Sequence, residues 1–356
     1  MNKKLYKASL CFILGAFAFL GTVGLAGCAS SQIVNNQIPA WVSSPKSVYD
    51  EDKFLTYVGY GDDRNSAEIA ALGGISAIFG RDVTVDTVTS KRMSEAVANG
   101  TVVTAQNREF SQDVQSKVNV DNLIGVEVPE YWFDGNNLWY AIAVLDKSKA
   151  SAIYSSMIEK NSTAVDDLIF SARKDLYSLQ SLCAYDFAQE IAIENKKNID
   201  RLMVLDYDYG ELVARGVILP EELARKKLEI AKEIPININI EGDIKGTYTS
   251  ALLDALADFG FSGSTDENVR YVINGKVSYN YEVTTDGKTH KCYYDFESSL
   301  IDTKNGVNVF PINIRGRQAH RSVEEAENSA KQDINKKIES TFHSQFNDYL
   351  SSYISK

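Results

Sequence analysis

The sequence offers few residues that could do chemistry, and the one with the clearest role is Cys28. A basic start at Lys3-Lys4 is followed by an apolar stretch and then by Leu25-Ala26-Gly27-Cys28. A basic segment, an apolar core and a small-residue cleavage site, in this order, are typical of a secretory signal peptide. Here a cysteine thiol follows the small residues directly.

The run Leu25-Ala26-Gly27-Cys28 resembles the lipobox of bacterial lipoproteins. In that family the cysteine thiol receives a diacylglyceryl group, the signal is cut before the cysteine, and the new amine is usually acylated too. The resemblance implies cleavage between Gly27 and Cys28 and lipid attachment at Cys28. Residues 8–27 could instead form a transmembrane anchor, since about 20 apolar residues can span a bilayer. Either way the rest of the chain is exported and tethered.

The three histidines, His290, His320 and His343, form no familiar metal or catalytic motif. None has the spacing of a metal ligand to another histidine or to a cysteine, and there is no HExxH sequence. Phosphate-binding glycine loops and a GxSxG motif are also missing from the sequence. We therefore expect surface or partly packed histidines, no metal or other cofactor, and no enzymatic activity.

Two short segments have part of a ligand-binding pattern. Gly59-Tyr60-Gly61 stands between a predicted strand and a predicted helix, where a phosphate could bind. The third glycine is missing, however, and Asp62-Asp63 would repel an anion. The acidic residues of 206–211 alternate as in a calcium loop but lack the remaining EF-hand spacing, so we predict a polar turn between helices there.

Charge and cysteine content narrow the classes of partner. The formal net charge is −11, and removal of Lys3, Lys4 and Lys7 with residues 1–27 makes it −14. Such a chain repels nucleic acid and anionic lipid, so we expect no nucleic-acid partner. The two cysteines of the exported body, Cys183 and Cys292, could form a disulfide in an oxidising compartment. Because they fall in different predicted domains, we favour two buried free thiols.

Composition shifts divide the chain into five segments and predict an α+β fold. Two small modules, each an antiparallel sheet with a helix, are joined by a long helical arm or hairpin. We assign a signal peptide to 1–27, a polar tether to 28–38, the first module to 39–150, the helical connector to 151–233, and the second module, ending in a long helix, to 234–356.

Hydrophobic patterns predict the elements of each segment. In the first module we expect strands over 54–60, 83–90, 107–120, 123–133 and 138–145, and a helix over 66–79 capped by Asn65 or Ser66. The connector is predicted to be helical almost throughout, with a break near 206–216 and a restart at Pro220. In the second module we expect strands over 236–240, 271–281, 288–302 and 307–315, a helix over 247–259, and a final helix that Ser322 caps.

The first module resembles the LPP20 family of bacterial lipoproteins over about residues 39–150. The likeness rests on Pro39-Ala40-Trp41-Val42, on Tyr57-Val58-Gly59-Tyr60-Gly61 and on Ser66-Ala67-Glu68 with its alanine-rich helix, and then on Gly125-Val126 and 139–146. It implies an envelope-anchored, non-catalytic protein and carries over no active-site residue.

These observations predict a lipid-anchored cell-envelope protein that works through contacts with other envelope proteins or as a structural component. The membrane is reached through the N-terminal lipid, and the body is periplasmic or surface-exposed. Ala29-Ser30 after the cysteine lacks the aspartate that retains many enterobacterial lipoproteins at the inner membrane, which favours the outer membrane. The alternative is a small-ligand or glycan-binding lipoprotein that uses its tyrosine-rich strands, where Tyr271, Tyr279, Tyr281, Tyr293 and Tyr294 could also pack in the core.

Overall fold

The computed structural model describes residues 37–78 and 124–352. The predicted signal peptide, Gly27 and Cys28 lie outside this part of the chain. So do the strands predicted over 83–90 and 107–120. Within the described ranges, no helix is both long and apolar enough to cross a bilayer.

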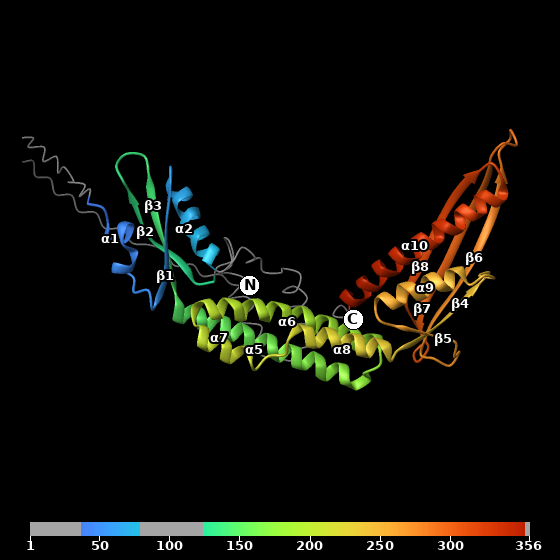
Figure 1. Cartoon of the computed structure of the whole chain (residues 1–356), viewed down its shortest axis with the longest axis horizontal. Helices are drawn as coiled ribbons and strands as arrows, with labels where there is room; N and C mark the ends of the chain where they lie inside the picture. Colours follow the sequence, from blue (N-terminus) through green and yellow to red (C-terminus); the bar gives the residue numbers. More distant parts are fainter. Residues whose placement is uncertain (1–36, 79–123, 353–356) are drawn as a thin grey trace, which may run out of the picture. The chain divides into compact units, whose positions relative to one another are not determined.

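In its described residues, 39–78 and 124–150, the first module is a three-stranded antiparallel sheet with a helix on one face (Figure 1). The strand order is β1-β3-β2, and the turn between β2 and β3 is held by Asp134, whose carboxylate accepts the amide hydrogens of Asn136, Asn137 and Leu138. Its elements in chain order are α1 (Ala40–Ser43), η1 (Pro45–Ser47), β1 (Phe54–Gly61), α2 (Arg64–Ile78), β2 (Val126–Phe133) and β3 (Trp139–Asp146).

Helix α2 packs on the sheet through small side chains. Ala67, Ala71 and Ile75 are fully buried, and they recur every four residues on one helix face. The helix begins two residues earlier than predicted, because Asp63 accepts the amide hydrogen of Ser66 and caps it. On the other face of the sheet, Trp41 packs with Ile142.

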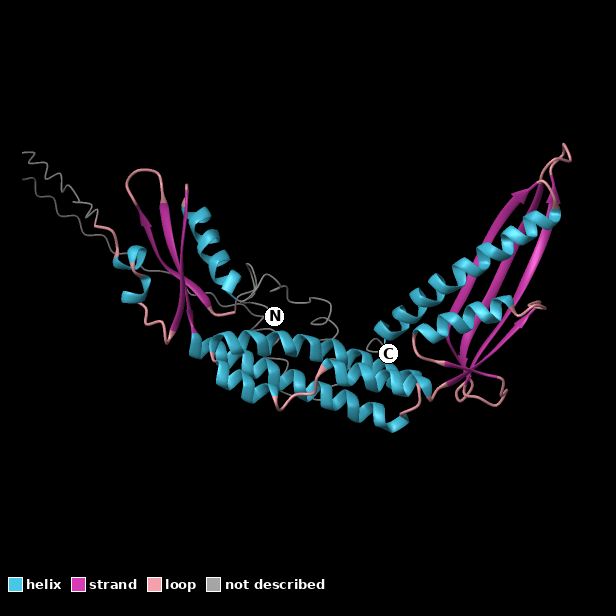
Figure 2. Cartoon of the chain, in the orientation of Figure 1, coloured by secondary structure: helices cyan, strands magenta, loops and turns pink. Residues whose placement is uncertain are grey.

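The connector is built of packed helices (Figure 2). Helices α5 and α6 form a hairpin in which the Asn195 amide donates to the carbonyl oxygen of Ile158 at 3.1 Å. Asp146, Ser178 and Asp206 each cap the helix that follows them. The elements are α5 (Lys147–Ala172), η2 (Arg173–Asp175), α6 (Leu179–Leu205), α7 (Tyr207–Ala214) and α8 (Pro220–Lys232).

The second sheet is mixed, with the order β5-β4-β6-β7-β8. Strand β4 runs parallel to both β5 and β6, whereas β6, β7 and β8 form an antiparallel meander. The elements are β4 (Pro235–Glu241), α9 (Thr247–Asp258), β5 (Ser262–Ser264), β6 (Tyr271–Val283), β7 (His290–Asp302), β8 (Val307–His320) and α10 (Val323–Ser351).

Helix α10 lies along β7 and β8 and covers the sheet (Figure 1). Its buried residues recur every four positions and make one continuous apolar stripe. Ser322 caps the helix by accepting the amide hydrogen of Glu325 at 3.2 Å. The stripe consists of Ala326, Ala330, Ile334, Ile338, Phe342, Phe346 and Leu350.

The α+β class is confirmed, and so are the helical connector and the long final helix. The prediction that the second sheet is wholly antiparallel was wrong. Helix α9 connects β4 to the strands beyond it, and a helical crossover allows parallel pairing where a tight hairpin cannot. The three-residue strand β5 was not predicted, since Ser262–Ser264 has no apolar alternation. The domain boundaries stay a prediction.

Candidate functional site

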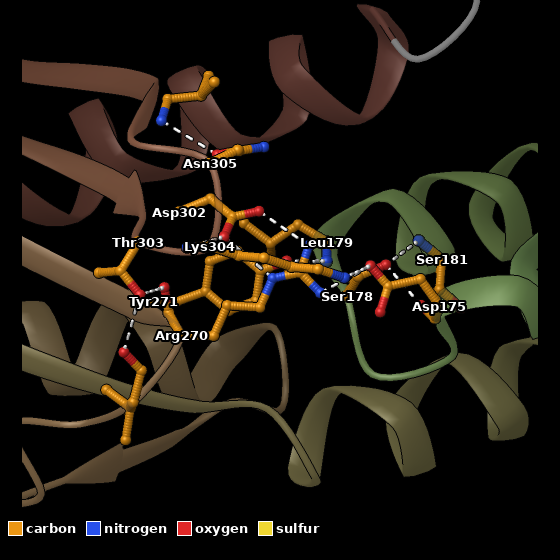
Figure 3. Close-up of polar contacts among 12 residues, drawn as sticks. Asp175, Ser178, Leu179, Ser181, Arg270, Tyr271, Asp302, Thr303, Lys304 and Asn305 are labelled. Carbon is orange, nitrogen blue, oxygen red and sulfur yellow. Dashed lines mark hydrogen bonds and ion pairs between the residues drawn. The ribbon is translucent and has the colours of Figure 1, made fainter.

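A cluster of polar side chains joins the connector to the second sheet, and we call it the joint (Figure 3). We define it as Asp175, Ser178 and Leu179 of the α5–α6 turn together with Arg270, Tyr271 and the turn after β7, residues 302–305. The two groups of residues are far apart in the sequence. Arg270 and Asp175, which form a hydrogen bond, are separated by 95 positions.

Arg270 is the centre of the joint (Figure 3). Its Nε and Nη2 donate to the two carboxylate oxygens of Asp302 at 3.0 and 2.8 Å, which is the bidentate arrangement that fits a guanidinium to a carboxylate. Its Nη1 donates to Asp175 at 2.7 Å. Asp302 raises the pKa of Arg270 most, although burial opposes it, and Asp175 adds to the effect. The two carboxylates therefore favour the charged form of Arg270.

Asp175 is shared between two cations. Lys304 Nζ reaches the same carboxylate oxygen as Arg270, at 3.3 Å. Partial burial by itself would raise the pKa of Asp175, but the hydrogen bonds from Arg270 and Lys304 together lower it below its usual value. The carboxylate is thus held ionised by neighbours that come from the second sheet.

Tyr271 completes the joint from inside the core. Its hydroxyl accepts the amide hydrogen of Leu179 at 3.0 Å, a helix-end donor that has no partner within the helix. Ser178 satisfies a second such donor, the amide of Ser181, at 3.0 Å. Burial raises the pKa of Tyr271 to about 12, so the hydroxyl is neutral at physiological pH.

The turn after β7 is shaped to present its charged groups. The Thr303 amide donates to the carbonyl of Arg270 at 2.8 Å, and the Lys304 amide donates to Asp302 at 3.1 Å. Gly306 has φ of 69°, which a residue with a side chain rarely adopts. Every charged group of the joint thus has a partner of opposite charge. These ion pairs hold the α5–α6 turn against the second sheet.

The segment Gly59-Tyr60-Gly61 is a packing feature. A Cβ atom at Gly59 would overlap the backbone nitrogen of Ala71, so glycine lets α2 approach β1 closely. The acidic segment 206–211 begins helix α7 instead of forming an open turn. The Asp206 carboxylate accepts the amide hydrogen of Tyr209 at 3.0 Å, and it acts as a helix cap.

The histidines lie nearer to other polar groups than the sequence indicated. His290 and His320 stand opposite each other in the β7–β8 register. His343 Nε2 lies 3.0 Å from the Asp258 carboxylate, and Glu339 is part of the same cluster. The sequence prediction missed this cluster, although the spacing of Glu339 and His343, four apart on one helix, was a signal for it.

The two described cysteines are buried, as predicted, but only some of the tyrosines are. No disulfide links the two described cysteines, Cys183 and Cys292, and both are buried. Tyr271 and Tyr294 are buried in the core, whereas Tyr281 and Tyr293 are exposed.

No family model and no curated protein matches the sequence. Among solved structures, this chain is similar to the secreted protein HP1454 of Helicobacter pylori. The match covers 82% of this chain and 97% of that protein, with 13% identity and a TM-score of 0.38. A minor lipoprotein of Acinetobacter baumannii is similar to 34% of the chain over 91% of its own, at 11% identity and a TM-score of 0.21. A lipoprotein of Caulobacter crescentus described as putative covers 34% and 90%, at 18% identity and a TM-score of 0.22. With TM-scores below 0.5, these likenesses establish neither a common fold nor a common role.

Proposed function

We propose that this chain is a non-catalytic lipoprotein of the cell envelope, anchored through Cys28 and acting by contacts with other envelope proteins. The observation that carries the proposal is the order of the N-terminal residues, from Lys3-Lys4 through the apolar stretch to Leu25-Ala26-Gly27-Cys28. Two or three acyl chains on one residue provide the double signal that stable anchoring needs.

The arrangement of polar groups supports a non-catalytic role. The carboxylates and cations of the joint bind one another, so none of them is poised to act on a substrate. Activated groups in enzymes are instead held in clefts, where burial and a specific neighbour tune their pKa.

The sheet surface supports protein contacts over the alternative of ligand or glycan binding. The helix-covered face is filled by Tyr294, Phe296 and Leu300. The opposite face is ionic, with Arg315 donating to Asp295 at 2.9 Å and to Glu297 at 2.5 Å. On that face Tyr293 is exposed, and the Arg317 guanidinium lies over its ring.

Metabolic labelling with a clickable fatty acid tests the anchor. We expect the probe to label the full chain expressed in bacteria, and a Cys28→Ser variant to lose the label and leave the membrane fraction. A Cys183→Ser variant is the matched control, because that thiol is buried in the helical connector. A wild-type chain that carries no label would overturn the proposal.

Crosslinking in intact cells, followed by mass spectrometry, tests the mode of action and the membrane. We expect the same envelope proteins to be recovered with the wild-type chain in repeated experiments and to be lost with Cys28→Ser. Separation of the two membranes should place the chain in the outer one. Recovery of the chain by itself in every repeat would contradict a role through protein contacts.

A further inference from the structure

We infer that Asp258, Glu339 and His343 form a binding site for a divalent transition-metal cation of the Zn²⁺ type. Asp258 is the last residue of α9, and the other two lie one turn apart on α10. One ligand atom from each residue lies within 4.8 Å of the others. Two carboxylates and an imidazole are among the ligands that Zn²⁺ takes in proteins.

The distances in this cluster fit a shared cation. Two ligands at Zn²⁺ bond lengths of 2.0–2.2 Å in tetrahedral geometry lie about 3.4 Å apart. His343 Nε2 and Asp258 Oδ2 are already 3.0 Å apart. Glu339 is exposed, so its side chain can rotate toward the same point at little cost.

The fold holds the imidazole in position. The His343 ring meets the Phe259 ring edge to face, with 4.9 Å between the ring centroids. Phe259 itself packs against Phe342 and Phe346 of the core. The imidazole is thus packed on one side against an anchored aromatic ring, with its Nε2 3.0 Å from Asp258.

The charges of the cluster suit a cation. Asp258 and Glu339 are exposed carboxylates close to each other, and a shared cation would offset their repulsion. In the described part of the chain, Glu339 makes no ion pair with a lysine or arginine.

The mixed ligand set selects the class of cation. Mg²⁺ and Ca²⁺ are hard ions that prefer sites made wholly of oxygen, whereas an imidazole suits Zn²⁺ and its neighbours among the transition metals. The three side chains leave at least one coordination position open to water. A bound ion would clamp the end of α9 to α10 and should stabilise the second module.

Calorimetric titration of the full chain in detergent with Zn²⁺, and separately with Mg²⁺, tests the site. We expect one Zn²⁺ per chain and much weaker Mg²⁺ binding. His343→Gln and Glu339→Gln should each weaken Zn²⁺ binding at least about 10-fold. Removal of a residue that only hydrogen-bonds to a metal ligand already costs about 10-fold, so removal of a ligand should cost no less. Circular dichroism without metal confirms that each variant is folded.

His320→Gln is the matched control, and it should leave Zn²⁺ affinity unchanged. Thermal unfolding gives a second readout, since saturating Zn²⁺ should raise the melting temperature of the wild-type chain and of His320→Gln only. The proposal is overturned by the lack of a Zn²⁺ heat, by equal affinity for Mg²⁺, or by Zn²⁺ binding that survives His343→Gln. Loss of binding in His320→Gln with retention in His343→Gln would place the site at the His290–His320 pair and overturn it as well.

Discussion

Replacement of Arg270 by methionine should loosen the joint more than any other single charge removal in the second module. Methionine keeps the apolar stem and removes the guanidinium, so the loss comes from the ionic contacts. Asp302 is left with 8% of its side chain exposed and with the Lys304 amide as a remaining donor. An uncompensated buried carboxylate is the costly product of this change.

The burial of the partners sets the magnitude. Removal of one partner from a fully buried ion pair costs about 3–5 kcal/mol, whereas an exposed pair contributes about 0.2–1 kcal/mol. The Arg270 side chain is 21% exposed and Asp302 is nearly buried, so we expect the low end of the buried range, about 3 kcal/mol. That corresponds to a roughly 100-fold change in the equilibrium for opening the joint.

Arg315→Met is the matched control. Arg315 also bridges two carboxylates, Asp295 and Glu297, but its side chain is 68% exposed. Solvent screens these contacts, so the expected loss is much smaller than that of Arg270→Met. Urea unfolding followed by far-UV circular dichroism measures both variants, and amide exchange of Leu179 locates the effect. Equal losses for the two arginines would refute the reasoning that burial decides the energy.

Two further changes test other parts of the fold. Gly59→Ala should destabilise the first module by about 1–3 kcal/mol, because the added methyl group overlaps the backbone of Ala71. Gly73→Ala should instead stabilise the module by about 0.5–1 kcal/mol, because no atom lies within 4 Å of the added methyl group and alanine favours the helix. Tryptophan fluorescence reports this module selectively, since the three tryptophans are Trp41, Trp132 and Trp139; Gly59→Ala unfolding at the same urea concentration as Gly73→Ala would contradict the packing argument. Alkali should destabilise the joint, because the folded pKa of Tyr271, about 12, lies above its unfolded value near 10; the stability is complete below pH 10 and is lost as pH rises through 12. Tyr271→Phe should flatten this loss in urea titrations at pH 9 to 12, and an unchanged slope would show that the ionisation of Tyr271 does not drive it.

Local patterns predicted most elements because their causes are local. The helix over 247–259 ends at Gly260, which adopts φ of 84° as the sequence suggested. The capping role of Ser322 and the four-residue apolar stripe of α10 were likewise readable from neighbouring positions. The errors have local causes too, since Asp63 outcompeted Asn65 and Ser66 as the cap of α2.

The parallel strand and the clusters could not be predicted in the same way. Strand β4 pairs with β6 across more than 30 intervening residues, and its Ile-Asn alternation is equally compatible with a parallel or an antiparallel neighbour. The joint unites Asp175 with Arg270, and the metal-ligand cluster unites Asp258 with His343. Sequence spacing does not show which side chains of remote segments meet once the chain is folded.

The sequence by itself determined the order of most described helices and strands, and it carries the predicted lipoprotein signal between Lys3 and Cys28. Both are written in contiguous residues, as a hydrophobic period or as a short peptide that an exporting machinery reads. Tertiary structure alone decided which carboxylate each arginine meets, which tyrosine hydroxyl ends in the core, and which acids stand beside His343. Those outcomes depend on burial and on distances between remote segments, which exist only in the folded chain.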